Sequence, residues 1–191
     1  MTNVKLENER LLEIVNEQDE VIGNKPRNDV HLHGLLHREV NVWLFDVAKN
    51  IFFQKAGLHR PSAGMLDASV GGHVNKGESY LEAALREAKE ETGISLSASD
   101  MFLLAKLRQN MSEDGAYSSG KSNNVIKSVF IYKNPIKEEK LRKEAGIPGG
   151  GFKKISLRLF SDPTYNFSKM IHPFVLKDQL PIVLKYLNNN D

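Results

Sequence analysis

One segment, GGHVNKGESYLEAALREAKEETGI at residues 71–94, constrains the fold and the chemistry of this chain most strongly. It joins a turn that contains glycine to a stretch with helical periodicity, from about Ser79 to Thr92. Ser79 and Glu82 have the spacing of an N-terminal capping box. Gly93 follows where a residue in the left-handed conformation commonly ends a helix. The segment therefore predicts a loop, one amphipathic helix and a second loop.

The two faces of this predicted helix differ in chemistry. At about 100° per residue, the apolar side chains form a stripe that we expect to face the core: Leu81, Ala84, Leu85 and Ala88. Glu87, Glu90 and Glu91 share another arc, with spacings at which like charges repel. A solvated acidic surface is one explanation. The other is a bound divalent cation, since Mg²⁺ prefers carboxylate oxygens and water as ligands.

The joint pattern is more specific than any single glutamate. It fills every fixed position of the Nudix signature: Gly72, five residues, Glu78, seven residues, and then REAKEETGI from Arg86 to Ile94. The segment thus resembles a Nudix box. This resemblance implies the Nudix fold, an α/β (α+β) architecture in which a mixed β-sheet is sandwiched between helices and the box forms a loop–helix–loop. It also implies metal-dependent attack of water on a diphosphate.

The resemblance also implies roles for the residues of the box. Mg²⁺ or Mn²⁺ would be held by four of them: Gly72 through its carbonyl, and Glu87, Glu90 and Glu91. Glu90 or Glu91 would take the proton from the attacking water, although a base from another loop (Glu113, Glu138 or Glu139) is an alternative. The catalytic group would be completed by Arg86, mainly as a bridge between carboxylates. Glu78 and Arg86 would pair across the loop, and Gly93 would fix the helix end.

A second resemblance extends upstream of the box, over roughly residues 10–94. The stretches LEIVNEQDEVIG, VHLHGLLHREVNVWLF and FFQKAGLHRPSAGMLDASVGGHV resemble the branch of the superfamily that includes type I isopentenyl-diphosphate isomerase. That isomerase uses a cysteine and a glutamate. Here Gly71 occupies the place of the cysteine, and Asn123 and Val125 occupy the places of glutamates. We therefore favour hydrolysis, with an isomerase-like protein or a catalytically idle diphosphate-binding module as alternatives.

Several residues outside the helix are candidates for metal or substrate binding. In the isomerase, histidines from the segment that corresponds to His31, His33 and His37 bind a metal together with the histidine of the turn, here His73. Ordinary packing is the alternative for these histidines. The related proteins also imply a set of contacts to the diphosphate of the substrate: Lys55, His59, Arg60 and His73.

The remaining pattern predicts a single Nudix domain over residues 1–191. It has an N-terminal elaboration with short strands (1–36), a core (37–160) and a C-terminal helical segment (161–191). Strands are expected at 11–16, 21–23, 40–47, 51–55, 101–108 and 125–133, an extended stretch at 67–74, and helices at 136–145 and 176–187. Residues 155–160 fit a strand or a helix.

Composition narrows the class of protein. The chain has a formal net charge of +2 and no cysteine, which gives no sign of a nucleic-acid binder and excludes disulfides and thiolate metal sites. We see no secretory signal and no apolar run of about 20 residues, which a membrane helix needs. A cytoplasmic protein that acts on a small diphosphate is expected, and exposed edge strands would allow a homodimer.

Overall fold

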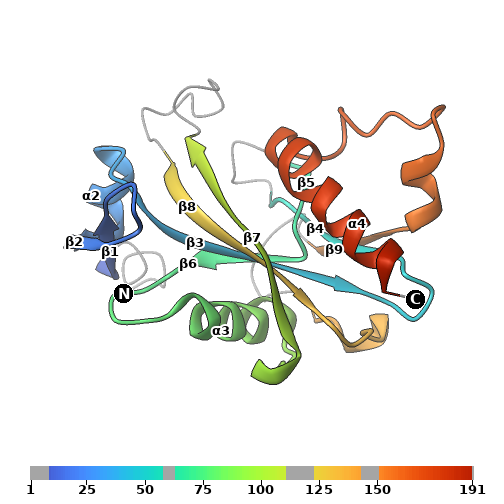
Figure 1. The fold of residues 1–191 in the computed structure, drawn as a ribbon, viewed down its shortest axis with the longest axis horizontal. Coiled ribbons are helices and arrows are strands. Elements are labelled where there is room, and N and C mark those ends of the chain that lie inside the picture. Colours follow the sequence, from blue (N-terminus) through green and yellow to red (C-terminus); the bar gives the residue numbers. More distant parts are fainter. Residues whose placement is uncertain (1–8, 58–62, 111–122, 143–150, 191) are drawn as a thin grey trace.

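The computed structural model describes residues 9–57, 63–110, 123–142 and 151–190, and Figure 1 shows their arrangement. The strands are β1 (Leu11–Val15), β2 (Val21–Pro26), β3 (His37–Phe45), β4 (Ile51–Lys55), β5 (Leu66–Asp67), β6 (Val70–His73), β7 (Met101–Asn110), β8 (Asn124–Tyr132) and β9 (Gly151–Ile155). The helices are α2 (Arg27–Leu32), α3 (Tyr80–Thr92), the π-helical segment η4 (Val175–Gln179) and α4 (Leu180–Asn189). Short 3₁₀ turns cover Ala98–Asp100, Glu138–Lys140 and Leu157–Ser161.

The long strand β3 organises the sheet. It pairs antiparallel with β6 on one side and parallel with β8 on the other, and β7 continues the sheet beyond β8. Its C-terminal end pairs with β4, which pairs in turn with β5 and β9. The N-terminal hairpin of β1 and β2 joins the start of β3 through Ile14 and His37. The mixed sheet predicted from the sequence is therefore confirmed.

Helices cover both faces of this sheet (Figure 1). On one face, α3 packs its small buried residues Ala83, Ala84 and Ala88 against Val40 and Val42 of β3. On the other face, the C-terminal segment packs over a second cluster, in which Trp43, Phe53 and Ile131 are completely buried. The polar residues of β3 on this second face are therefore covered as well.

The helix α3 begins and ends as the sequence predicts. The side chain of Ser79 accepts a hydrogen bond from the Glu82 amide, and the Glu82 carboxylate accepts one from the Ser79 amide. Gly93 adopts the left-handed conformation, with φ 75°. The buried stripe is rotated from the predicted one, however. It runs through Ala83, Ala84, Ala88 and Glu91, whereas Leu81 and Leu85 are only half-buried.

Three expectations about local structure were wrong. The segment α2 was not predicted as a helix; it is one turn and a half long, and buried Val30 anchors it. Residues 136–142 form no α-helix but a 3₁₀ turn at Glu138–Lys140, and 143–145 lie outside the described residues. Val47 was expected to belong to the long strand, but β3 ends at Phe45 and the Val47 side chain is 85% exposed in the turn that follows.

We expect Leu187→Ala to lower the free energy of unfolding by about 2–5 kcal/mol, the usual range for a large-to-small change in a core. Leu187 of α4 is 2% exposed and belongs to the cluster around Trp43. Urea unfolding followed by circular dichroism measures the effect. The matched control is Val47→Ala, which should change stability by no more than about 0.5 kcal/mol. Equal effects of the two changes would contradict the packing of α4 on the sheet.

Candidate functional site

The strand β6, which contains Gly71 and Gly72 where the sequence predicted a turn, and the helix α3 approach each other closely. A Cβ atom added to Gly72 would overlap the Glu87 side chain. Gly71 donates a hydrogen bond from its amide to Glu91 Oε2, at 3.0 Å. Gly72 thus lets the Glu87 side chain lie directly against the backbone of β6, and the Gly71 amide holds Glu91 beside it.

Arg86 ties the carboxylates of the loop to those of the helix. Its Nε and Nη2 donate to the two oxygens of Glu78, at 2.8 and 2.9 Å. Its Nη1 donates to Glu87 Oε1 at 2.7 Å and lies 3.3 Å from Glu90 Oε2, and Nη2 also donates to the His73 carbonyl. The pairing of Arg86 with Glu78 holds the loop against the helix. Because Arg86 is turned toward these acids, its place in the structure suits the bridging role better than a direct catalytic one.

The three carboxylates of the helix differ in exposure. Glu91 is 6% exposed, the Glu87 side chain 13% and the Glu90 side chain 46%. Burial raises the pKa of Glu87 to about 7, despite the neighbouring Arg86, because the charged form loses water. A divalent cation would stabilise such a buried carboxylate, and oxygen ligands from carboxylates and a backbone carbonyl suit Mg²⁺ or Mn²⁺. The residues of the box therefore fit the metal that the resemblance implies.

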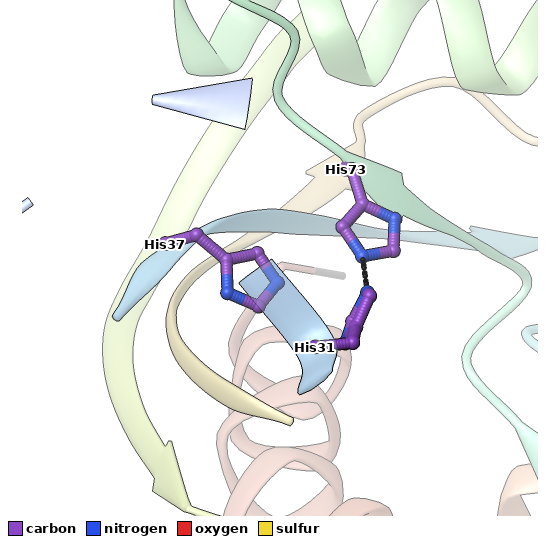
Figure 2. Close-up of side chains that lie close together, drawn as sticks. All are labelled: His31, His37 and His73. Atoms are coloured by element: carbon purple, nitrogen blue, oxygen red, sulfur yellow. Dashed lines mark hydrogen bonds between the residues drawn. The ribbon is translucent and has the colours of Figure 1, made fainter. Parts of the chain in front are cut away.

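A second cluster lies beside α2, on the face of β3 opposite to α3. It joins three imidazoles, and Figure 2 shows their rings turned toward one another: His31 of α2, His37 of β3 and His73 of β6. One ligand atom from each ring lies within 4.8 Å of the others. Burial lowers the pKa of His37 to about 4 and the pKa of His73 well below its usual value, so both rings are neutral near pH 7. His33 ends α2 as its C-cap and is not in the cluster.

A buried ion pair adjoins this cluster, and the sequence analysis missed it. Glu39 Oε2 lies 3.1 Å from Lys127 Nζ, and both residues are 8% exposed. Asn123 donates to Glu39 Oε1 at 3.0 Å. Burial alone would raise the pKa of Glu39, but Lys127, the neighbouring histidines and the hydrogen bond from Asn123 together outweigh it, so the net shift is downward. In the sequence, Glu39 and Asn41 alternate with Val40 and Val42. This pattern is typical of a strand with one face in water, so it does not indicate a buried ion pair.

The other predicted residues lie elsewhere. Lys55 is exposed at the end of β4, and His59 and Arg60 are outside the described residues. Among the alternative bases, Glu138 pairs with Lys154 and Glu139 is exposed in the same turn. Glu113 is also outside the described residues. The structure therefore brings the residues of the box together in one cluster and His31, His37 and His73 together in another. No described contact connects Glu138 or Glu139 to either cluster.

Comparisons with known proteins agree with this arrangement. The chain matches the family model of the NUDIX domain over residues 35–155. An uncharacterised Nudix hydrolase of Streptomyces coelicolor is 44% identical over 93 residues, which are 46% of this chain and 49% of that protein. An isopentenyl-diphosphate Delta-isomerase of Serratia proteamaculans is 36% identical over 88 residues, with the same coverage. The chain thus spans about half the length of these curated relatives.

The fold also matches a solved structure. The crystal structure of a Deinococcus radiodurans protein superposes with a TM-score of 0.58 at 22% identity, over 92% of this chain and 97% of that chain. At this identity the likeness concerns the fold alone. No helix in the described ranges has the length and apolar character needed to cross a bilayer.

Proposed function

Since this chain belongs to the Nudix family and has the mixed α+β fold of that family, we propose that it is a Mg²⁺- or Mn²⁺-dependent hydrolase. Its substrate would be a small diphosphate, such as a nucleoside diphosphate linked to another group. Nudix hydrolases generally act on substrates that contain a diphosphate. The observation that carries the proposal is the contact of Glu87 and Glu91 with Gly71 and Gly72 of β6.

Each acidic residue has a separate task in this proposal. Glu87, Glu91 and the Gly72 carbonyl would hold the metal on the buried side, and Glu90 would face the solvent side, where its carboxylate is 46% exposed. The chemistry that the bound ion supplies is neutralisation of the diphosphate oxygens and a lower pKa for the attacking water. Glu90 is our candidate for the base that takes the proton, because it is the most exposed of the three.

Arg86 would act as a positioning residue. Its guanidinium contacts Glu78, Glu87 and the His73 carbonyl at the same time, so it holds the loop against the helix. It would also reduce the repulsion between Glu87 and Glu90 before the metal binds. Lys55, together with His59 and Arg60, remains our candidate for contacts to the substrate.

Isomerase chemistry is the second candidate, because relatives that carry that name match this chain. It needs a proton donor and acceptor on opposite sides of a double bond. Gly71 has no side chain, and a Cβ there would lie 3.1 Å from Asn41 Oδ1, so Asn41 already fills the nearby space. Val125 is apolar and completely buried. These observations favour hydrolysis, and conversion of isopentenyl diphosphate to dimethylallyl diphosphate by the pure protein would reverse the ranking.

A substrate panel tests the proposal. Purified protein is incubated with nucleoside diphosphate derivatives and isoprenoid diphosphates in ¹⁸O-labelled water, with Mg²⁺ or Mn²⁺. We expect cleavage of at least one diphosphate, with the label in a phosphate product. A chelator should abolish the activity, and added metal should restore it. Tight binding of a diphosphate without turnover would favour the idle binding module instead.

Location and assembly stay predictions. We expect a cytoplasmic protein, and a homodimer is the assembly to test, by light scattering during size-exclusion chromatography. The described edge strand β7 exposes Phe102 and Leu103, at 48% and 45%. If a dimer is found, these two residues are the first to substitute in a test of its interface.

A further inference from the structure

We propose that Gln179 and Asn41 are specificity-determining residues, which bind a polar group attached to the diphosphate of the substrate, such as a sugar hydroxyl or a carbonyl oxygen. The two side chains meet on the face of β3 that the C-terminal segment covers. The inference rests on the diphosphate site proposed above and specifies which class of attached group that site accepts. An apolar prenyl chain is the class that it rejects.

Two donors from β3 determine the orientation of the Gln179 side chain. The indole nitrogen of Trp43 and the amide nitrogen of Asn41 each lie 3.2 Å from Gln179 Oε1. An indole N–H can only donate, so the atom of Gln179 that faces it is the carbonyl oxygen. The Asn41 atom that faces the same oxygen must also be a donor, its Nδ2. Gln179 Nε2 therefore keeps two N–H groups that neither of these residues uses.

The Nε2 group of Gln179 is buried without an acceptor. The residue is completely buried, and Nε2 has no hydrogen-bond partner within the part of the chain that the structure describes. An unpaired buried donor is costly, and nearly all such groups in native proteins have a partner. A hydroxyl or carbonyl oxygen of a bound molecule would supply this partner. The amide of Gln179 therefore indicates a place for an acceptor atom of a ligand.

Asn41 connects this amide to the proposed diphosphate site. It is the direct partner of Gly71 across β3 and β6, and its Oδ1 would lie only 3.1 Å from a Cβ atom added to Gly71. The Gly71 amide in turn donates to Glu91 Oε2 at 3.0 Å. Asn41 and Gly71 thus link Gln179 to a carboxylate of the proposed metal site. Because Gly71 has no side chain, only its backbone lies between the two amides and that carboxylate.

The backbone at Gln179 is unusual in a way that supports a binding role. Gln179 ends the π-helical segment η4, after which the Leu180 amide donates to the Val175 carbonyl, five residues earlier. Pro181 follows in the first turn of α4. It has no amide hydrogen, so a regular α-helical hydrogen bond cannot form at this point. π-Helical turns are rare and are frequently found at functional sites, and here the turn carries the side chain that reaches β3.

The chemistry of this face favours a polar group over a prenyl chain. Glu39 lies two positions before Asn41 on β3, so the two side chains share a face, and Glu39 pairs there with the buried Lys127. A prenyl chain would leave the Nε2 group of Gln179 unpaired, whereas a hydroxyl or a carbonyl would accept from it. A site built to bond a polar group rejects analogues that lack it. We therefore expect a diphosphate that carries a sugar or another hydroxylated group.

The test compares the affinities of polar and apolar diphosphates. The full-length protein is titrated calorimetrically with ADP-ribose, UDP-glucose, dimethylallyl diphosphate and inorganic pyrophosphate, with Ca²⁺ in place of Mg²⁺ so that binding is measured without turnover. We expect ADP-ribose or UDP-glucose to bind more tightly than dimethylallyl diphosphate by about tenfold, the effect of roughly one hydrogen bond. Gln179→Met should remove this preference. The affinity for pyrophosphate, which carries no attached group, should stay unchanged.

Two further variants separate recognition from folding. Trp43→Phe removes one bond to Gln179 Oε1 but keeps Nε2, so it should retain the preference. Asn41→Leu should lose it, and this variant decides the question if Gln179→Met does not fold.

Several outcomes would overturn the inference: no preference in the unaltered protein, no binding of any of these ligands, a preference that survives Gln179→Met or Asn41→Leu, or equal effects of Trp43→Phe and Gln179→Met. A loss of pyrophosphate affinity in Gln179→Met would do so too, since the residue would then act only through the fold. The hydrolysis assay remains separate. A polar preference without turnover would contradict the proposed hydrolysis and leave recognition standing, whereas turnover without the preference would contradict the recognition alone.

Discussion

Glu87→Gln should lower kcat/KM for diphosphate hydrolysis by about a thousandfold. Metal ions contribute several kcal/mol of charge stabilisation to such reactions, and each 1.36 kcal/mol corresponds to about tenfold in rate. Gln is nearly isosteric and can still accept the hydrogen bond from Arg86. The loss would therefore come from the missing charge, with the fold retained. Steady-state kinetics with saturating Mg²⁺, together with a circular dichroism spectrum, measures both quantities.

The same helix provides the control. Glu82 is an exposed carboxylate of α3 whose interaction is with the Ser79 cap. Glu82→Gln keeps the capping box, since Gln also serves at this position, and should leave kcat/KM unchanged within a factor of two or so. Glu91→Gln should resemble Glu87→Gln, because its carbonyl can still accept from the Gly71 amide. Full activity of the Glu87 and Glu91 variants would remove both residues from the proposed metal site.

The local structure of the box could be predicted because short-range chemistry determines it. The cap at Ser79, the periodicity of the helix and the left-handed Gly93 all act within a few residues, so they are readable from sequence. The same holds for the hairpin of β3 and β4, where β-prone runs flank a turn. Periodicity predicted the helix but not which of its sides is buried. The packing of Ala83 against the sheet depends on distant residues that it contacts.

The elements that were not predicted depend on long-range packing. The segment α2 is too short to be stable alone, and Val30 holds it by burial. At 136–145 the sequence favours a helix, but in the described part the Arg142 amide donates a hydrogen bond to the distant Thr92 carbonyl. Local propensity is a weak prior, and tertiary contacts override it.

Local sequence patterns predict the candidate site only in part, for the same reason. The spacing of the acids along one helix predicts the box, whereas nothing in the local spacing joins His31 or His37 to His73. Only the resemblance to the isomerase branch suggested that grouping, and the sheet register explains it. Glu39 and Lys127 were missed because alternating polar residues usually indicate a face in water. Here the C-terminal segment covers that face, and Phe174 lies 5.5 Å from Lys127 Nζ.

Gly72→Ala should remove most of the proposed hydrolytic activity while leaving most of the stability of the fold. The added methyl group would occupy the position of the Glu87 side chain. A glutamate can rotate away at small cost to the fold, but it then leaves the place where it would bind metal. The backbone of Gly72 is not left-handed, so alanine itself introduces no strain there. We expect kcat/KM to fall about a hundredfold or more, with only a modest decrease in Tm.

A double-mutant cycle shows whether Gly72 acts through Glu87. If the alanine only displaces the Glu87 carboxylate, the Gly72→Ala/Glu87→Gln protein should be no less active than the worse single variant, since residues that act as a unit are not additive. Multiplied losses would mean that Gly72 contributes separately, for example through its carbonyl. Gly23→Ala in β2 is the matched control, because its added methyl would meet only Ile14 at an ordinary 4.0 Å. Activity of Gly72→Ala equal to that of Gly23→Ala would contradict the close contact on which the proposed metal site rests.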